Sequence, residues 1–486
     1  MSRPRLRFDY GCYFPDSIKI TSFNSGQDFL IGALDENEAQ GILIGKVAEF
    51  DGDMGRDVWL DTKGAHVVYI IGKRRGGKSY TLGAIAEGLV ESSFQTGKTD
   101  QSVLVLDTLN IFWTIEDPPG NTPLEKIQLD ELQKWNLSPS GLSKTLVFYP
   151  RGHKREYYPQ TYKEFSLKPS DLDAADWASL FELDLIADPM GQLIGEIFQK
   201  VVHEGYQGDQ QRIGPNVSYD VDDLLKCIQI DPDLARFEKN TVEALSRRLR
   251  AVKSLSLFHS QGTDVRQLFS PGFVSVILLR DLDAQLRGLV VGLLTKKIME
   301  LRGITCELEK RIGLLQAKAS RIGESNDPRA KGLSREIERL QERVESGVAR
   351  GWILIDEGHN YIPQLGIIGS KAPLKRYVNE GRNLGLSLAI TTQQPSGLDG
   401  AIRRNADVLF IHSISMKGDL EATESMLNTM VPEESEISRS KVTTRVFEKL
   451  ARDMPLGYCI VSCANASRVF VMKVRPRISA HGGAEY

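Results

Sequence analysis

From residue 66 onward, short apolar runs alternate with longer stretches in which apolar and polar residues follow a helical spacing. The runs cover 67–71, 103–106, 146–149, 274–279, 353–355, 386–390 and 408–411. Strands that are apolar on both faces are typical of a parallel sheet covered by helices on each side, whereas half-buried strands alternate. The pattern therefore predicts an α/β fold built on a doubly wound parallel sheet.

Other segments break this pattern and suggest the domain organisation. Residues 1–62 show short alternating runs separated by Gly and Asp, which favours a small β-rich module, either a barrel or a sandwich. The core would then comprise 63–164, a strand in 271–283, and 351–465, followed by a tail at 466–486. A helical insertion is expected at 165–270 and a helical hairpin at 284–350.

The hairpin rests on apolar residues at spacings of four, three, four and four, namely Leu333, Ile337, Leu340, Val344 and Val348. Its turn is expected at 323–329, which is rich in helix breakers. The hairpin either braces its own subunit or contacts a neighbour. The insertion carries a basic stripe, which is either a solvated helix face or a binding surface; its members are Arg247, Arg248, Arg250 and Lys253.

The apolar run 67–71 leads into a glycine-rich turn and a helix that begins near Lys78. Gly72, Gly77, Lys78 and Ser79 fit the phosphate-binding pattern G-x-x-x-x-G-K-[ST]. Glycines allow backbone N–H groups to turn toward phosphate oxygens, and the helix N-terminus adds its dipole. We expect Lys78 to reach the β- and γ-phosphates and Ser79 to hold Mg²⁺. The expected ATP-binding set is Gly72, Arg75, Gly76, Gly77, Lys78, Ser79 and Tyr80.

Polar residues also follow other strands of the predicted sheet, where ligands of such folds bind. The strand at 351–355 is followed by Asp356, expected to position Mg²⁺, and by Glu357, expected to orient or deprotonate the attacking water. Gln393 follows the next strand and could contact the γ-phosphate or the water; alternatively it stabilises the following turn. Asp107 ends another strand and could face the same cleft.

Candidate arginine fingers are Arg382, in Glu380-Gly-Arg-Asn, and the pair Arg403 and Arg404. An arginine finger neutralises charge that develops on the γ-phosphoryl group, but each could equally be a surface arginine. Lys371, Lys375 and Arg376 form a candidate DNA-binding patch.

Composition is ordinary for a globular protein, with 41% hydrophobic and 26% charged residues. The net charge of -3 means that any nucleic-acid contact must come from local basic patches. The five cysteines show no C-x-x-C pairing, and no apolar run approaches the ~18 residues of a membrane span. We therefore expect a cytoplasmic protein with reduced cysteines and no membrane partner.

The ordered motif set resembles the HerA family, a branch of the FtsK–HerA DNA-translocating ATPases. The resemblance rests on 72–79, on 356–363 (Asp-Glu-Gly-His-Asn-Tyr-Ile-Pro), on 380–385, on 393–396 and on 474–483 (Val-Arg-Pro-Arg-Ile-Ser-Ala-His-Gly-Gly). It implies a RecA-like P-loop ATPase core and a homo-hexameric ring that pumps double-stranded DNA using ATP and Mg²⁺. A nuclease or other effector usually accompanies such a motor, in DNA repair or antiviral defence. The resemblance also implies that Glu357 is the catalytic acid, that Gln393 senses the γ-phosphate, and that Arg382 serves the phosphate site.

The chain departs from the family pattern in its short β-rich module and at two places in its motifs. Residues 73–77 (Lys-Arg-Arg-Gly-Gly) stand where the family often has a Thr-Gly-Ser-Gly core before the lysine. The segment after Asp107 lacks an acidic residue that the family usually carries. Two other functions share features with this sequence. A superfamily-two helicase is disfavoured because its arginine-rich motif is missing; an ATP-gated scaffold that assembles an effector complex without translocation remains the alternative.

Overall fold

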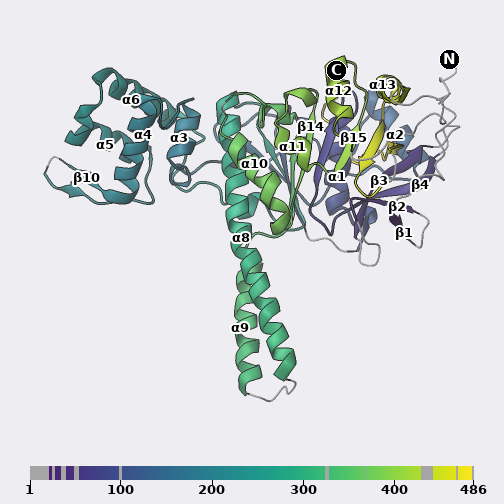
Figure 1. Ribbon diagram of the computed structural model, residues 1–486, viewed down its shortest axis with the longest axis horizontal. Coiled ribbons are helices and arrows are strands. Elements are labelled where there is room, and N and C mark those ends of the chain that lie inside the picture. Colours follow the sequence, from purple (N-terminus) through teal and green to yellow (C-terminus); the bar gives the residue numbers. More distant parts are fainter. Residues whose placement is uncertain are drawn as a thin grey trace.

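The computed structural model describes residues 21–24, 28–33, 40–48, 54–97, 101–208, 210–322, 328–366, 368–427, 442–466 and 469–483. Its centre is a run of parallel strands (Figure 1). In spatial order these are β15 (Val408–Ile411), β5 (Val67–Ile71), β14 (Leu386–Thr392), β13 (Gly351–Ile355), β7 (Ser102–Asp107), β12 (Val274–Leu278), β8 (Thr145–Pro150) and β9 (Lys163–Phe165). The predicted parallel α/β sheet is confirmed.

Beyond β15 the same sheet continues with mostly antiparallel strands. These are β16 (Tyr458–Cys463), β17 (Phe470–Val474), β3 (Gly41–Ala48), β4 (Met54–Asp61), β2 (Asp28–Ile31) and β1 (Thr21–Phe23), with β6 (Gln95–Thr96) on the side of β3. The described strands of the N-terminal module thus extend the core sheet through the β3–β17 pair. The module was expected to be a barrel or sandwich of its own; residues 1–20, 25–27, 34–39 and 49–53 lie outside the described part, and the domain boundaries stay a prediction.

Apart from the edge strand β9, the strands of the core are buried on both faces, which explains their near-continuous apolar sequences. In β5, Tyr69 and Ile71 join one hydrophobic cluster, whereas Val68 and Ile70 join the other. The second cluster includes α1 (Lys78–Val90) and α2 (Pro123–Lys134). The first includes α10 (Lys371–Glu380), α11 (Gly400–Asn405), α12 (Lys417–Glu424) and α13 (Val442–Asp453).

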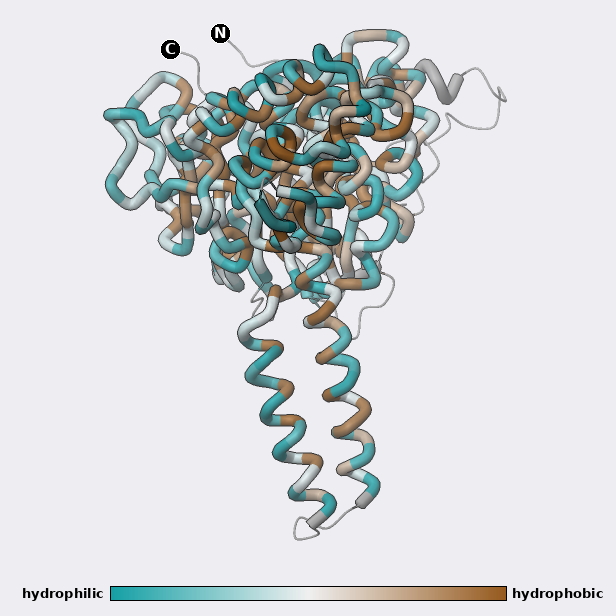
Figure 2. The backbone as a smooth tube through the Cα atoms, turned by 90° about the vertical axis from the view of Figure 1, so that its left-hand side faces the viewer, coloured by the Kyte–Doolittle hydropathy of each residue, from teal (hydrophilic) through white to brown (hydrophobic). Residues whose placement is uncertain are grey.

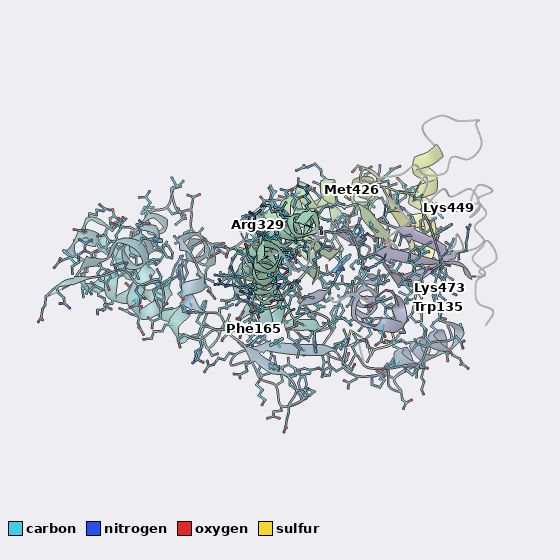
Figure 3. All side chains as sticks on the ribbon, turned by 90° about the horizontal axis from the view of Figure 1, so that it is seen from below. Trp135, Phe165, Arg329, Met426, Lys449 and Lys473 are labelled. Atoms are coloured by element: carbon cyan, nitrogen blue, oxygen red, sulfur yellow. The ribbon has the colours of Figure 1, made fainter. Side chains whose placement is uncertain are left out.

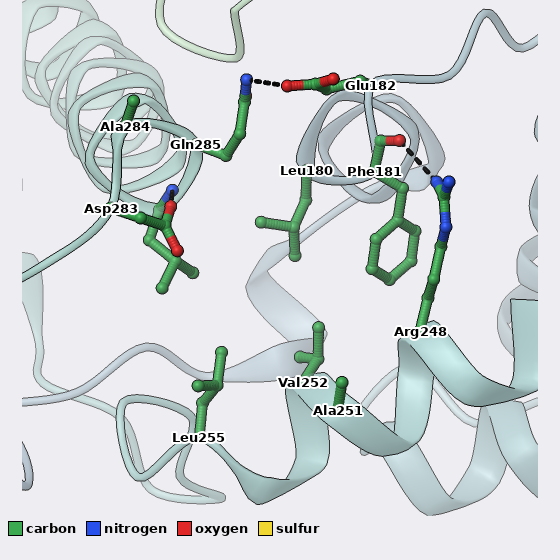
Figure 4. Close-up of a pocket in the computed structure, with 11 residues that line it drawn as sticks. Leu180, Phe181, Glu182, Arg248, Ala251, Val252, Leu255, Asp283, Ala284 and Gln285 are labelled. Atoms are coloured by element: carbon green, nitrogen blue, oxygen red, sulfur yellow. Dashed lines mark hydrogen bonds between the residues drawn. The ribbon is translucent and has the colours of Figure 1, made fainter.

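A helical body lies to one side of the sheet (Figure 1, left). It contains α3 (Ala174–Leu180), α4 (Pro189–Gln199), α5 (Val221–Ile230), α6 (Lys239–Ser254) and the small hairpin of β10 (Tyr206–Gln207) and β11 (Arg212–Ile213); α7 (Val265–Leu268) returns the chain to β12. A groove of about 580 Å³ lies between α3, α6 and the start of the long helix α8 (Ala284–Ile322) (Figure 4). Here Arg248 of the basic stripe donates to the carbonyl of Phe181 at 2.6 Å, and Lys253 pairs with Asp222 at 2.6 Å. These contacts favour a structural role for that stripe.

Two helices form a hairpin that projects from the core, α8 (Ala284–Ile322) and α9 (Pro328–Glu345) (Figures 1 and 2). From below, the hairpin points at the viewer, with Arg329 near the start of α9 (Figure 3). The expected apolar stripe of α9 is its less exposed side, and it packs along α8. The expected turn falls largely on 323–327, outside the described residues. In the part of the chain that the structure describes, no helix is both long and apolar enough to cross a membrane.

Candidate nucleotide site

The phosphate loop connects β5 to α1, and its glycines are sterically required. Gly77 has φ 105°, a conformation that side chains rarely adopt. A Cβ on Gly72 would lie 2.8 Å from the Cβ of His412, and one on Gly76 would lie 2.9 Å from the carbonyl oxygen of Lys73. The first N–H groups of α1 therefore open toward the space above β5, where they can bind phosphate oxygens.

Lys78 lies at the start of α1 and is almost completely buried. Its Nζ donates to the carbonyl of Lys73 at 3.1 Å and lies 3.9 Å from Oε1 of Glu357. Burial lowers the pKa of Lys78, and the nearby carboxylates of Glu357 and Asp356 oppose that change. Because its carboxylate neighbours are further away than its carbonyl partner, the ammonium can turn to an incoming phosphate without breaking a close ion pair.

Asp356 follows β13 and is fully buried beside the loop. It accepts hydrogen bonds from Ser79 Oγ at 3.2 Å and from Thr391 Oγ1 at 2.6 Å. Burial raises the pKa of Asp356, and Glu357 adds to the rise, while Thr391, Lys78 and Ser79 lower it. Ser79 and Asp356 thus share the position expected for Mg²⁺. The described residues hold no cluster of three or more His, Cys, Asp or Glu suited to a metal, but Mg²⁺ bound through phosphates needs only one or two protein ligands.

Glu357 has φ 54°, an unusual backbone conformation for a residue with a side chain. Its backbone N–H donates to Thr391 Oγ1 at 3.0 Å, and its Oε1 accepts from Gln393 Nε2. Its Oε2 is buried without a hydrogen bond and lies 3.4 Å from Nδ1 of His359. A strained residue with one uncommitted carboxylate oxygen is suited to accept a proton from a water.

Two groups that line or support this cleft, Thr391 and His412, were not among the residues predicted from the sequence. Thr391 holds both Asp356 and the Glu357 backbone, as described above. His412 follows β15 and fixes the floor of the loop: its Nε2 pairs with Thr81 Oγ1 at 2.9 Å and its Nδ1 with the carbonyl of Tyr458 at 2.9 Å. Burial lowers the pKa of His412 to about 4, so the ring stays neutral. The feature of the sequence that could have identified His412 is its position directly after a core strand.

Asp107 is at the end of β7 but serves the chain itself. Its carboxylate accepts from the backbone N–H groups of Leu109, Ile111 and Phe112, at 3.2, 3.0 and 2.7 Å. Burial raises the pKa of Asp107 to about 6, against those three hydrogen bonds. The group shapes the following loop, and its oxygens are already occupied.

Arg382 does not lie in the cleft of its own chain, contrary to the simplest form of its expected role. Its Nε donates to the carbonyl of Ala65 at 3.1 Å and its Nη2 to Asp407 at 2.9 Å. Both partners precede strands, β5 and β15, whereas the phosphate loop follows β5. Because parallel strands align their ends, Arg382 lies at the amino-terminal ends of the strands, opposite the phosphate loop at their carboxyl ends.

The other basic candidates also lie apart from the loop. Arg403 and Arg404 are in α11, which runs back toward the amino end of β15. Arg404 is exposed and forms no hydrogen bond or ion pair with the described residues. In the expected DNA patch, Lys371 donates to the carbonyl of Gln364 at 3.0 Å. Lys375 lies 3.6 Å from Asp399, and Arg376 lies 2.8 Å from Glu380. Local acids thus compete with DNA for that patch.

The sheet order, the phosphate loop after β5 and the acids after β13 define a RecA-like P-loop NTPase. Residues 57–298 match the family model described as the helicase HerA central domain, and the chain belongs to the HerA family. This agrees with the resemblance read from its motifs.

Comparison with one solved structure, VirB4, supports the fold. VirB4 of Thermoanaerobacter pseudethanolicus is similar at a TM-score of 0.50 and 13% identity, covering 91% of this chain and 98% of that one. The plasmid coupling protein TrwB, in complex with the GTP analogue GDPNP, gives a TM-score of 0.45 at 14% identity, covering 86% of this chain and 87% of that one. No curated protein matches the sequence significantly.

Proposed function

We propose that this protein is an ATP-driven motor that moves double-stranded DNA, works as a hexameric ring, and acts with a nuclease or other effector in DNA end processing or antiviral defence. The observation that carries the proposal is that five groups meet at the carboxyl ends of the central strands. These are Lys78, Ser79, Asp356, Glu357 and Gln393. The match to the helicase HerA central domain supports DNA as the substrate.

The geometry suggests how ATP would be hydrolysed. Lys78 and the N-terminus of α1 would hold the phosphates, and Ser79 with Asp356 would hold Mg²⁺, which neutralises phosphate charge. Glu357 would take a proton from the attacking water. Gln393, which donates a hydrogen bond to Oε1 of Glu357, would orient both the carboxylate and the water. Arg382, Arg403 and Arg404 lie away from this cleft. The arginine that neutralises the γ-phosphoryl group would therefore come from a neighbouring subunit.

DNA contact would be electrostatic and independent of sequence, because the chain as a whole carries a charge of -3 and only local surfaces are basic. We therefore expect affinity for duplex DNA to fall steeply with salt. The acidic and polar groups of the site described above would all serve ATP hydrolysis. We therefore assign any cutting of DNA to a separate effector protein.

The first test measures ATP hydrolysis with and without duplex DNA, together with the mass of the protein in solution. A motor should be stimulated by duplex DNA, form a ring with ATP, and displace a triplex-forming strand from a DNA track. ATP turnover and ring assembly without any strand displacement would instead favour the ATP-gated scaffold.

The second test assigns the chemistry to residues. Lys78→Ala should weaken ATP binding, and Glu357→Gln should bind ATP but lose turnover by roughly 10²–10⁴-fold, as expected for loss of a general base. Glu380→Gln is the matched control, since Glu380 is exposed and, among the described residues, forms an ion pair only with Arg376. Hydrolysis by Glu357→Gln at the rate of that control would overturn the assignment.

A further inference from the structure

The C-terminal segment 475–483 folds back over α1, the helix that begins at the phosphate loop. Its anchor is Glu87, a fully buried carboxylate of α1. Glu87 accepts hydrogen bonds from Arg475 at 2.9 Å, from Arg477 at 3.2 Å and from the hydroxyl of Ser479 at 2.7 Å. Both arginines are themselves fully buried. A buried and fully bonded ionic network fixes one arrangement of the segment, because any other would leave charges unpaired.

This anchoring brings His481 to the first turn of α1. The rings of His481 and Tyr80 meet edge to face, with centroids 5.7 Å apart. Tyr80 directly follows Ser79, and its hydroxyl accepts the backbone N–H of Arg477 at 2.8 Å. The two rings therefore stand beside the phosphate loop, one from the helix and one from the far end of the chain.

The imidazole of His481 is held in one protonation form. Its Nδ1 lies 3.0 Å from Nη1 of Arg477, an obligate donor, so Nδ1 accepts and Nε2 carries the proton. Burial and the charge of Arg477 lower the pKa of His481 to about 3, which keeps the ring neutral. Within the described part of the chain, Nε2 makes no hydrogen bond.

The glycines after His481 keep this site open and close to the core. A Cβ on Gly482 would lie 2.7 Å from Nε1 of Trp113, so only glycine lets the segment pass that ring. A Cβ on Gly483 would lie 3.2 Å from Nε2 of His481 and would crowd it. The segment thus presents the free N–H donor and the ring of His481, beside the ring of Tyr80 from α1, at the margin of the nucleotide cleft.

The orientation of a bound nucleotide follows from the residues at the other margin. Asp356, Glu357 and Gln393 mark the γ-phosphate end, because water is activated there. Phosphate loops hold the α- and β-phosphates on the backbone at the start of the helix. The nucleoside then leaves the loop away from Glu357, next to the first turn that carries Tyr80.

We propose that Tyr80 and His481 form the wall that receives a purine base of the bound nucleotide, with the ring faces for stacking and His481 Nε2–H as a donor to a ring nitrogen. The inference rests on the proposed function and adds a role for the C-terminal segment in selecting the nucleotide. Purines stack over a larger area than pyrimidines, so the wall favours ATP and GTP over CTP and UTP.

The experiment measures kcat/KM for ATP and CTP, and equilibrium binding of both, with the full-length protein. Wild type should prefer ATP, and His481→Ala should reduce the ATP-to-CTP ratio about tenfold, the size expected for one stacked base. His481→Phe should keep most of the ratio, since it retains a ring. His203→Ala removes an exposed imidazole from the helical body and should leave the ratio unchanged.

A purely structural role of the segment would lower stability, or turnover of all nucleotides equally, without changing the ratio. If His481→Ala does not fold, Tyr80→Leu decides by the same ratio. A folded variant that keeps the wild-type ratio, or a wild type that binds CTP as well as ATP, would overturn the inference while leaving the ATPase in place. If the protein binds ATP in preference to CTP but does not hydrolyse ATP, that result would count against the proposed function alone.

Discussion

Buried charges lie at both ends of β5, and they are arranged differently. At the amino end, His66 lies between Asp407 at 2.7 Å and Asp61 at 3.0 Å, and Asp407 also binds Arg382. At the carboxyl end, one carboxylate oxygen of Glu357 is buried without a hydrogen bond. Buried polar groups normally have hydrogen-bond partners. The carboxyl end, where Glu357 lacks one, is therefore suited to bind a ligand, and the amino end, where His66 is fully paired, is structural.

The amino-end cluster makes stability depend on pH. Burial alone would lower the pKa of His66, but hydrogen bonds to Asp407 and Asp61 raise it to about 9. A histidine of the unfolded chain titrates near ~6.5. The stabilisation by His66 is therefore complete below that pH, falls as pH rises toward about 9, and is lost above it.

We expect His66→Asn to be less stable than wild type at pH 6 and to approach wild type by pH 10. Denaturant unfolding at several pH values measures the gap, which should not exceed about 3 kcal/mol. Other titrating groups cancel in the comparison of the two proteins. A gap of constant size across this range would contradict a charged His66.

Membership of a short local motif decides which of these residues can be identified from the sequence alone. Lys78 and Ser79 belong to one short pattern, and Glu357 directly ends an apolar strand, so strand-end reasoning brings them together. His66 and Asp407 are 341 positions apart, and no spacing in the sequence relates them. Arg382 was assigned by its motif, but its location depends on which strand end it reaches, and only the fold determines that.

At the scale of elements, periodicity found the helices and core strands but not the long-range strand pairing. The parallel strands were predictable because each is apolar along its whole length. The pairing of β3 with β17 was not, since Val47 meets Met472 only after the intervening core has folded. The N-terminal strands therefore looked like a separate module in the sequence, although they extend the same sheet.

The projecting hairpin is fastened to the core by one buried cation. Arg302 of α8 is 1% exposed and makes two hydrogen bonds of 2.7 Å with Glu309. It also donates to the carbonyl of Leu384 at 2.7 Å, in the turn that carries Arg382. The same side chain thus joins the base of the hairpin to the segment before β14.

We expect Arg302→Met to destabilise the protein by about 2–4 kcal/mol, because Glu309 and a buried carbonyl lose their partner. Thermal unfolding measures the loss, and limited proteolysis should show earlier cleavage within α8 and α9. Arg311→Met is the matched control on the same hairpin: its pair with Glu336, at 3.3 Å, is exposed and should contribute under ~1 kcal/mol. Equal effects of the two substitutions would contradict the fastening role.

For the whole molecule, the positions of Arg382, Arg403 and Arg404 support the proposed assembly into a ring. The phosphates would meet Lys78 from one chain, but Arg382, Arg403 and Arg404 all lie away from that cleft. Arg382 is paired with Asp407, whereas Arg404 is exposed and forms no hydrogen bond or ion pair with the described residues. Repeated contact between unlike faces of identical subunits closes into a ring, which would place such an arginine at the next subunit's ATP.

Mixing two inactive variants tests this arrangement. Lys78→Ala lacks the phosphate cation, and Arg404→Ala should lose about 10³–10⁵-fold in turnover if that arginine acts across the interface. In an equal mixture, about a quarter of the interfaces join an intact Lys78 to an intact Arg404, so activity should return to roughly that share of wild type. Arg382→Ala serves as comparison, and its main effect should be on stability. A mixture that stays as inactive as its parts, although both variants assemble, would exclude Arg404 as the trans group. A monomer that hydrolyses ATP at the full rate would exclude the ring itself.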